Sequence, residues 1–307
     1  MHNTPAADPP SAPDATTAAL VPSSALPTEV RVLDQFAWRE YRDKPAMETA
    51  NPVHTAMVAD EAGNVRLCYV KLTPNMAEPT LLCEALGWVL AGHAGLRRAD
   101  FAAIILVDKA KLAKSLTLNY LCTAFDGPFI PAWCTEAVPG KVIKSIANPT
   151  GKLNIQYVQD SKAFLNSVDA PKFAAFDMWT GLRDRNMGNV IRHSAGGYAS
   201  IDHETVLHDT LWQDSIFNFN SLVADATAGL DPKRLKAFKS SMTLAAAGHP
   251  GALANAQVEL QAILNYFLPS AKGTHADVFG ALGTRSQNGW LAKELGVLDM
   301  APKEDKI

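Results

Sequence analysis

Apolar and polar positions near the start of the chain predict two strands joined by a tight turn. Residues 53–59 and 65–72 carry clustered or alternating apolar side chains, and Asp60-Glu61-Ala62-Gly63-Asn64 between them has the composition of a hairpin turn. The second strand ends in Tyr69-Val70-Lys71-Leu72, so one lysine stands inside an otherwise apolar strand. Because an unpaired buried ammonium is costly, we expect Lys71 to have a charged partner.

The next segment, from Thr80 to Leu96, has apolar residues at helical spacing. The repeat consists of Leu82, Leu86, Val89, Leu90 and Ala94. Glu84 lies near the start of this predicted helix on a different face, and it is the candidate partner of Lys71. Each residue alone also fits a simpler interpretation, a strand-edge lysine with its head in water and an acidic residue favoured by the helix dipole.

The rest of the chain changes from strands to helices. Apolar runs at 101–107 and 129–137 have the length of buried strands. Beyond Asp202 the pattern is helical: Asp231-Pro232 predicts a helix start, and residues 252–267 form an apolar repeat that Pro269 ends. A strand-rich first half and a helical second half predict the α+β class.

Polar side chains of one kind concentrate between residues 176 and 204. Asp184 and Asn189 are five residues apart, and Asp202 follows after a predicted hairpin made of Val190-Ile191, a polar turn at 193–197, and 198–201. Carboxylate and amide oxygens in this order can position a hydroxyl and hold magnesium. Any one of the three alone is also typical of an ordinary turn.

The motif formed by these residues resembles that of a known family. The pattern Phe-Asp-x-Trp-x-Gly-x-x-Asp-Arg-Asn-x-x-Asn, followed by Ile-Asp-His, is similar to the bacterial HipA-like kinases and, more distantly, to the phosphatidylinositol 3/4-kinases. Asn186 stands where those families often have His, and Glu204 stands where a Gly usually follows the metal-binding Asp. The resemblance implies a two-lobed, protein-kinase-like fold, with a β-rich ATP-binding lobe at 29–137 and a mostly helical catalytic lobe at 138–307.

The same resemblance implies a role for each candidate site residue. Asp184 would orient or deprotonate the acceptor hydroxyl, Asn189 and Asp202 would hold Mg²⁺, Lys71 would contact the ATP phosphates, Glu84 would fix Lys71, Arg185 would support the loop through a carboxylate or backbone contact, and Glu136 and Ala137 would form the adenine hinge. Neither a Gly-x-Gly-x-x-Gly loop nor a Walker P-loop is present. HipA-like kinases have an atypical phosphate loop, which accommodates this absence.

Partners follow from the resemblance rather than from the residues. HipA-like kinases phosphorylate serine of translation proteins such as aminoacyl-tRNA synthetases and often serve as toxins held in check by an antitoxin. The resemblance therefore implies a serine or threonine acceptor on a protein, and an antitoxin or regulatory partner. A lipid headgroup or a small molecule stays open as the acceptor.

Two other functions compete with the kinase hypothesis. A pseudokinase that binds nucleotide without transfer is motivated by Glu204 and by the missing glycine loop. A zinc hydrolase is suggested by His203-Glu204-Thr205-Val206-Leu207-His208, but its histidines are five residues apart, whereas the zincin spacing of four puts both on one helix face.

Composition sets the remaining expectations. The chain has 307 residues, 48% hydrophobic content and a formal charge of -3, which favours one large core or two lobes and argues against a broad nucleic-acid-binding surface. The four cysteines are Cys68, Cys83, Cys122 and Cys134. They form no close metal-ligand pair, as expected in a reducing cytoplasm.

Residues 1–28 are rich in Pro, Ala, Thr and Ser and are expected to form a disordered tail without a secretory signal. No apolar run is long enough to span a membrane.

Overall fold

A computed structural model of the chain describes residues 30–44, 52–73, 78–115, 127–146, 154–212 and 220–297. The predicted disordered tail at 1–28 and Cys122 lie outside these ranges. The described part contains one six-stranded sheet, one three-stranded sheet and a group of helices, so the predicted α+β class is confirmed.

The larger sheet has the strand order β1-β5-β6-β4-β3-β2. Its strands are β1 (Arg31–Val32), β2 (Trp38–Asp43), β3 (Val53–Ala59), β4 (Val65–Leu72), β5 (Ala102–Asp108) and β6 (Phe129–Glu136). Only the β1–β5 pair is parallel. The predicted hairpin is confirmed, because β3 and β4 pair in register from Val53 opposite Lys71 to Ala59 opposite Val65.

The hairpin turn forms for local reasons. Gly63 has a φ of +83°, a conformation that glycine adopts without steric cost. The carboxylate of Asp60 accepts a hydrogen bond from the backbone amide of Asn64 at 2.8 Å. The conformation of Gly63 and the hydrogen bond of Asp60 fix the register of β4, and with it the face of the sheet on which Lys71 lies.

Side chains alternate between the two faces of β4. Cys68, Val70 and Leu72 are fully buried in one hydrophobic cluster with side chains of β3, β5 and β6. Leu67, Tyr69 and Lys71 lie on the opposite face because successive strand residues point to opposite sides. A short helix, α2 (Lys109–Ala113), follows β5.

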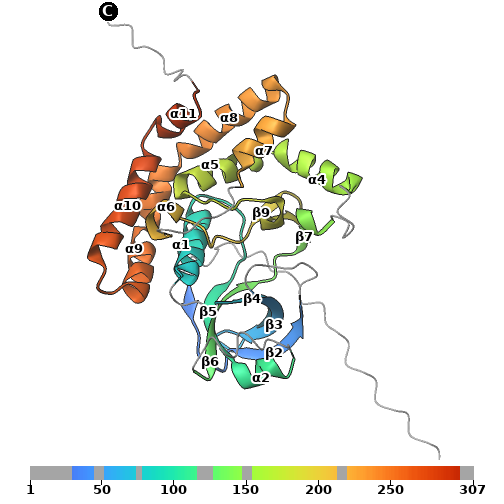
Figure 1. The fold of residues 1–307 in the computed structure, drawn as a ribbon, viewed down its shortest axis with the longest axis vertical. Coiled ribbons are helices and arrows are strands. Elements are labelled where there is room, and N and C mark those ends of the chain that lie inside the picture. The colour runs from blue at the N-terminus through green and yellow to red at the C-terminus, as the bar shows by residue number, and fades with distance from the viewer. Residues whose placement is uncertain are drawn as a thin grey trace, which may run out of the picture.

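Helix α1 (Thr80–His93) lies between the six-stranded sheet and the helical part of the molecule (Figure 1). Every residue from Thr80 to Ala91 is buried, since α1 packs against α9 (His249–Phe267) and contacts β5 and β6. The sequence predicted one apolar face with Glu84 on another; instead, both faces are covered. Although α1 falls within 29–137, its apolar side chains belong to the same cluster as those of the helices.

The second half of the chain is mainly helical, as predicted. Its other elements are β7 (Gly140–Val142), η1 (Ile143–Ile146), α4 (Ile155–Leu165), α5 (Ala170–Thr180), η2 (Met187–Asn189), β8 (Val190–His193), β9 (Tyr198–Ser200), α6 (His208–Leu211), α7 (Leu222–Gly229), α8 (Pro232–Ala246), α10 (Lys272–Ser286) and α11 (Trp290–Glu294). The expected helix start at Asp231-Pro232 is confirmed: the Asp231 carboxylate caps α8 by accepting from the Arg234 amide at 2.9 Å. The predicted hairpin after Asn189 is the β8–β9 pair.

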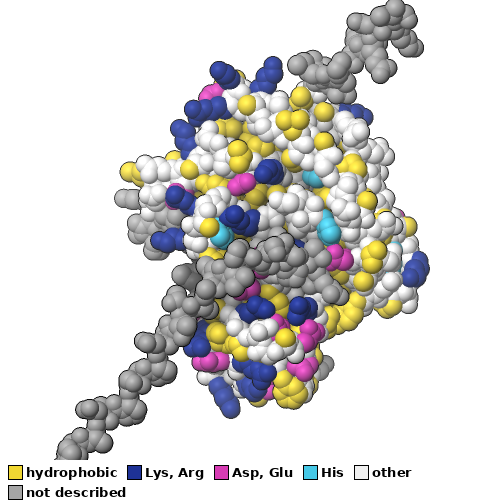
Figure 2. All heavy atoms as spheres, turned by 180° about the vertical axis from the view of Figure 1, so that it is seen from behind, with side chains coloured by type: hydrophobic (Ala, Val, Ile, Leu, Met, Phe, Trp, Pro, Cys, Tyr) yellow, Lys and Arg dark blue, Asp and Glu magenta, His cyan; other side chains and the backbone are white. Residues whose placement is uncertain are grey.

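Two surface properties bear on the expected partners. Figure 2 shows acidic and basic side chains side by side over the six-stranded sheet, so that part of the visible face carries no single-sign surface. None of the helices in the described ranges is both long and apolar enough to cross a bilayer.

Candidate functional site

Lys71 is the centre of a charged cluster that joins three separate elements. Its Nζ atom donates to Glu84 Oε1 on α1 at 2.5 Å and to Asp202 Oδ1, just beyond β9, at 2.5 Å. The predicted pairing of Lys71 with Glu84 is therefore confirmed. Burial by itself lowers the pKa of Lys71, but the surrounding carboxylates outweigh it and hold that pKa well above its usual value.

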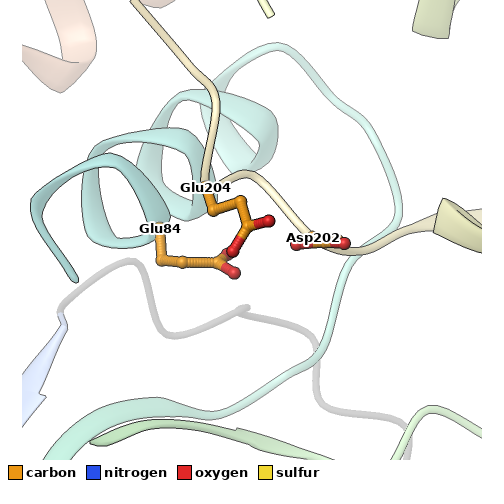
Figure 3. A group of neighbouring side chains, drawn as sticks. All are labelled: Glu84, Asp202 and Glu204. Carbon is orange, nitrogen blue, oxygen red and sulfur yellow. The ribbon is translucent and has the colours of Figure 1, made fainter. Parts of the chain in front are cut away.

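Glu204 is a third carboxylate in this cluster and was not predicted as a site residue. Its Oε2 lies 3.3 Å from Lys71 Nζ. In Figure 3 the carboxylates of Glu84 and Glu204 point toward each other, and Asp202 lies beside them on the segment that also carries Glu204. One ligand atom from each of the three lies within 4.8 Å of the others.

The crowding of carboxylates affects the titration of Glu84. Its side chain is buried, and burial is the main cause that raises its pKa, to about 7. Lys71 opposes this shift, whereas the two neighbouring carboxylates add to it. The second oxygen of Glu84, Oε2, accepts from the backbone amide of His203 at 2.9 Å. Glu84 therefore links β4 to the segment after β9.

That segment has an unusual backbone. Asp202 has a φ of 62°, the left-handed region, which Asp tolerates better than most other residues. His203 next to it is buried, and its Nε2 lies 3.0 Å from Ser200 Oγ. Burial, followed by the nearby cations, lowers the pKa of His203 well below its usual value, so the ring is neutral. The neutral ring can then pack in the core behind Glu84.

Asp184 lies in the loop after α5, where two amide side chains hold it. Its Oδ1 accepts from Asn186 Nδ2 at 3.0 Å and from Asn220 Nδ2 at 2.6 Å. The backbone amides of Arg183 and Asp184 both donate to Thr205 Oγ1, at 3.3 Å and 3.1 Å. With Oδ1 occupied by two donors, Oδ2 is the carboxylate oxygen better placed to accept a proton.

Asn189 is oriented by the same loop. Its Nδ2 donates to the carbonyl of Asp184 at 2.7 Å, which leaves its Oδ1 as the atom that can act as a metal ligand. Its backbone carbonyl accepts from the amide of Ile201, the residue before Asp202, at 3.2 Å. The loop with Asp184 and the segment with Asp202 are thus hydrogen-bonded to each other.

Arg185 holds this arrangement from inside the protein. It is fully buried, and its guanidinium donates to the Asp177 carboxylate at 3.0–3.2 Å and to the carbonyls of Asn189 and Ile201 at 3.1 Å and 3.0 Å. The expected supporting contact of Arg185 through a carboxylate and the backbone is confirmed. It is a positioning residue, since its donors are directed at protein atoms.

Glu136 and Ala137 lie at the end of β6, where the sheet already uses their amides. The Glu136 amide donates to Phe101 at 3.0 Å, and the Ala137 amide donates to Leu67 at 2.9 Å. The expectation that an adenine base takes a backbone donor at these two residues therefore needs correction. β6 lies between β4 and β5, so its amides are satisfied on both sides. The next backbone amide along the chain is that of Val138, and Pro139 after it has no amide hydrogen.

The donor set fits a hard divalent cation. Glu84, Asp202 and Glu204 bring one carboxylate oxygen each within 4.8 Å of one another, and carboxylate oxygens are ligands that Mg²⁺ prefers. The amide oxygen of Asn189 is a donor of the same kind, on the loop that is hydrogen-bonded to the Asp202 segment. His203 uses its Nε2 toward Ser200, and its ring also packs against Phe176 at 5.9 Å between centroids. The zinc alternative finds no support in this geometry, because His203 belongs to the core.

Sequence reasoning missed Glu204, Asn220 and Thr205 as parts of the site. Glu204 was noted only as a departure from the family pattern, and its distance from Lys71 depends on the turn at Asp202. Asn220 is 36 residues beyond Asp184, and no local pattern marks it. Thr205 lies in the segment that resembles a zincin motif.

Neither a protein-family model nor a curated protein matches this chain.

Proposed function

We propose that the protein is an ATP- and magnesium-dependent phosphotransferase of the HipA-like type, which transfers the γ-phosphate to a hydroxyl. One observation carries the proposal: Lys71 Nζ bonds to Glu84 on α1 and to Asp202 beyond β9, both at 2.5 Å. A strand lysine held by a helix glutamate, next to an Asp–Asn loop, is the set of groups that protein kinases use for phosphoryl transfer. The six-stranded sheet with α1 would form one lobe, and the helices would form the other.

In this proposal each side chain has a task that its contacts support. Asp184 takes the proton from the acceptor hydroxyl through Oδ2, as the oxygen–phosphorus bond to the acceptor forms and the bond to the ADP oxygen breaks. Lys71 offsets negative charge on the phosphates, and Glu84 and Asp202 keep its ammonium in place. Asn189 and Asp202 would hold Mg²⁺, which supplies further neutralisation of phosphate charge when bound.

The nucleotide base would lie on the face of β4 that carries Lys71, near the end of β6. Leu67 and Tyr69 lie on the same face of β4 as Lys71 and are partly exposed, so they offer an apolar surface for a purine. The amide of Val138 replaces those of Glu136 and Ala137 as the proposed backbone donor. A serine or threonine of a protein is the proposed acceptor, on the strength of the family resemblance.

The test compares γ-phosphate transfer by the wild type, Asp202→Asn and a control, Asp277→Asn. The control removes one carboxylate from the exposed side of α10, away from Lys71. We expect Asp202→Asn to lose at least about a hundredfold in rate, because it removes the charge that would hold magnesium and that keeps the Lys71 ammonium in place. The control should keep full activity, and all three should unfold at similar temperatures. Near-normal transfer by Asp202→Asn would contradict the assignment.

Glu204 favours one second candidate, a nucleotide-binding pseudokinase. Its carboxylate lies 3.3 Å from Lys71 Nζ and occupies space where phosphate charge would approach. A protein of this kind would bind ATP with magnesium but transfer nothing. A magnesium-dependent thermal shift with ATP, without measurable transfer to protein or water, would favour this candidate over the kinase.

A further inference from the structure

Three cationic side chains lie on the elements that flank the Asp184 loop. Lys141 belongs to β7, Lys144 to η1 and Arg192 to β8, and all three are exposed. The three-stranded sheet that carries two of them lies between the six-stranded sheet and α4 (Figure 1). These three residues are called the cationic surface below.

Two of the cations are held next to each other by strand pairing. Lys141 and Arg192 are directly opposite in the β7–β8 pair. Residues in this relation have their side chains on the same face of the sheet, with Cβ atoms roughly 5 Å apart, and like charges there are destabilising. The fold therefore keeps two positive charges together at a cost in stability, which a bound anion would offset.

One carboxylate compensates the cationic surface in part. Arg192 Nη1 donates to Asp160 Oδ1 at 3.0 Å, and Asp160 Oδ2 accepts from Gln156 Nε2 at 3.1 Å. The Arg192 side chain is 61% exposed, whereas that of Asp160 is 6% exposed, so the carboxylate lies on the buried side of the guanidinium. Among the described residues, no carboxylate lies within 4 Å of the ammonium of Lys141 or Lys144. Both lysines therefore keep their charge available to a ligand.

Lys144 connects the cationic surface with the Asp184 loop. A Cβ atom at Gly188 in η2 would lie 3.3 Å from Cδ of Lys144 and 2.6 Å from Oδ1 of Asn186. The Nδ2 atom of Asn186 donates to Asp184 Oδ1 at 3.0 Å. The lysine stem therefore lies against the turn that holds Asp184. An extended peptide with its hydroxyl at Asp184 would reach the Lys144 ammonium within about four residues.

Acidic side chains of a protein fit this surface better than a nucleic acid does. Proteins that bind nucleic acid usually present a broad basic face to a continuous row of phosphates. Here the chain has a formal charge of -3, and three carboxylates surround Lys71. Those carboxylates repel a long polyanion, whereas a peptide can place a few acidic residues at the cations and an uncharged hydroxyl residue at Asp184.

We propose that Lys141, Lys144 and Arg192 recognise acidic residues of the acceptor protein, so that the enzyme selects a serine or threonine within an acidic sequence. Binding of an acidic peptide depends on the cationic surface alone. The identification of that peptide as the acceptor rests on the proposed function, because it needs γ-phosphate transfer at Asp184.

The binding test uses fluorescence anisotropy with three labelled peptides that share a central serine. The serine is flanked on both sides by glutamate, by glutamine or by lysine, and no nucleotide is present. We expect the full chain to bind the glutamate peptide at least about threefold more tightly than the glutamine peptide at low salt, and the difference to shrink as salt rises. Equal affinity for these two peptides would overturn the proposal.

Charge reversal tests which residues are responsible. The double variant Lys141→Glu with Lys144→Glu should bind the lysine peptide more tightly than the glutamate peptide. The matched control, Lys233→Glu with Lys236→Glu, makes the same change in net charge on exposed positions of α8, which packs against α5, α7 and α11. The control should keep the wild-type preference, and both variants should unfold at urea midpoints close to that of the wild type. An equal loss of preference in both would show that net charge, not this surface, governs binding, and the proposal would be wrong.

A labelled thymidine oligonucleotide tests the other kind of polyanion. We expect it to bind the wild type more weakly than the glutamate peptide does. If it binds more tightly, and loses that affinity in the variant with Lys141→Glu and Lys144→Glu, the surface binds nucleic acid and the proposal is refuted.

Phosphate transfer from MgATP tests the acceptor assignment. We expect kcat/KM to be at least about threefold higher for the glutamate peptide than for the glutamine peptide, through a lower KM. Transfer to both peptides with equal kcat/KM refutes the acceptor assignment and leaves the proposed function standing. A glutamate peptide that binds through the two lysines, to a protein that transfers phosphate to no serine, refutes the proposed function and leaves the binding surface standing, so the two failures are distinguishable.

Discussion

At Gly87, helix α1 lies directly against the segment that follows Asp202, and Gly87→Ala tests how tightly the two are packed. A Cβ atom at residue 87 would lie 2.3 Å from the Cβ of His203 and 3.1 Å from Cγ2 of Val206. Both neighbours are buried, so neither can turn aside into solvent. The helix or the segment must therefore move by about 1 Å to reach ordinary contact distances.

The size of the effect follows from two opposing terms. Overpacking a well-packed core costs about 1–3 kcal/mol, while alanine gains about 1 kcal/mol over glycine in a helix. We expect a net loss of up to about 2 kcal/mol in the free energy of unfolding. Activity should fall further, because Glu84 is one turn away and its Oε2 accepts from the His203 amide at 2.9 Å. A displacement of about 1 Å at catalytic groups can reduce the rate about a hundredfold.

The assay combines urea unfolding with the rate of phosphate transfer, and Gly280→Ala is the matched control. A Cβ at Gly280, in α10, meets no atom within 4 Å, so the same substitution should be neutral or stabilising there and should leave transfer unchanged. If Gly87→Ala is as stable and as active as Gly280→Ala, the contact between α1 and His203 does not position Glu84.

Two further predictions concern buried ionisable groups. His54 is buried and accepts from Trp38 Nε1 at 3.0 Å, and burial lowers its pKa to about 4. Between that value and its unfolded pKa of about 6.5, the unfolded chain binds more protons, so the stability of the wild type falls as pH falls. His54→Gln keeps a hydrogen-bond acceptor but does not titrate. Between pH 7 and pH 5 in urea titrations, its free energy of unfolding should therefore fall by about 2 kcal/mol less than that of the wild type. Arg185→Lys cannot reproduce the bonds of the buried guanidinium to Asp177 and two carbonyls, so we expect about 2–4 kcal/mol of destabilisation by urea unfolding, and an unchanged midpoint would contradict that role.

The parts of the site that sequence predicted are those fixed by local patterns. Lys71 stands in an apolar strand, and an unpaired charge there would be unfavourable, so a partner on the next element was expected. Glu84 met that expectation because α1 follows β4 in the chain and brings the Glu84 carboxylate to 2.5 Å from Lys71 Nζ. The five-residue spacing of Asp184 and Asn189 likewise predicted one loop, in which Asn189 Nδ2 reaches the Asp184 carbonyl.

The parts that sequence did not predict depend on contacts between distant segments. The second buried face of α1 exists because α9, more than 150 residues later, covers it. Asn220 reaches Asp184 through a short parallel bridge that no local pattern announces. The amides of Glu136 and Ala137 are occupied because β6 lies between β4 and β5, an order that follows from the whole sheet.

Glu204 has the largest consequence among the unpredicted contacts, because it changes the charge balance at Lys71. One ammonium meets three carboxylates, which gives a net charge of -2 if all of them are ionised. The raised pKa of Glu84, about 7, shows that burial and its acidic neighbours oppose full ionisation of the cluster. A triphosphate would add further negative charge to this region, where partial burial weakens solvent screening. On the proposed function, nucleotide can therefore bind well only together with a divalent cation, and Asp202 and Glu204 become favourable neighbours of the phosphates only when that cation is present.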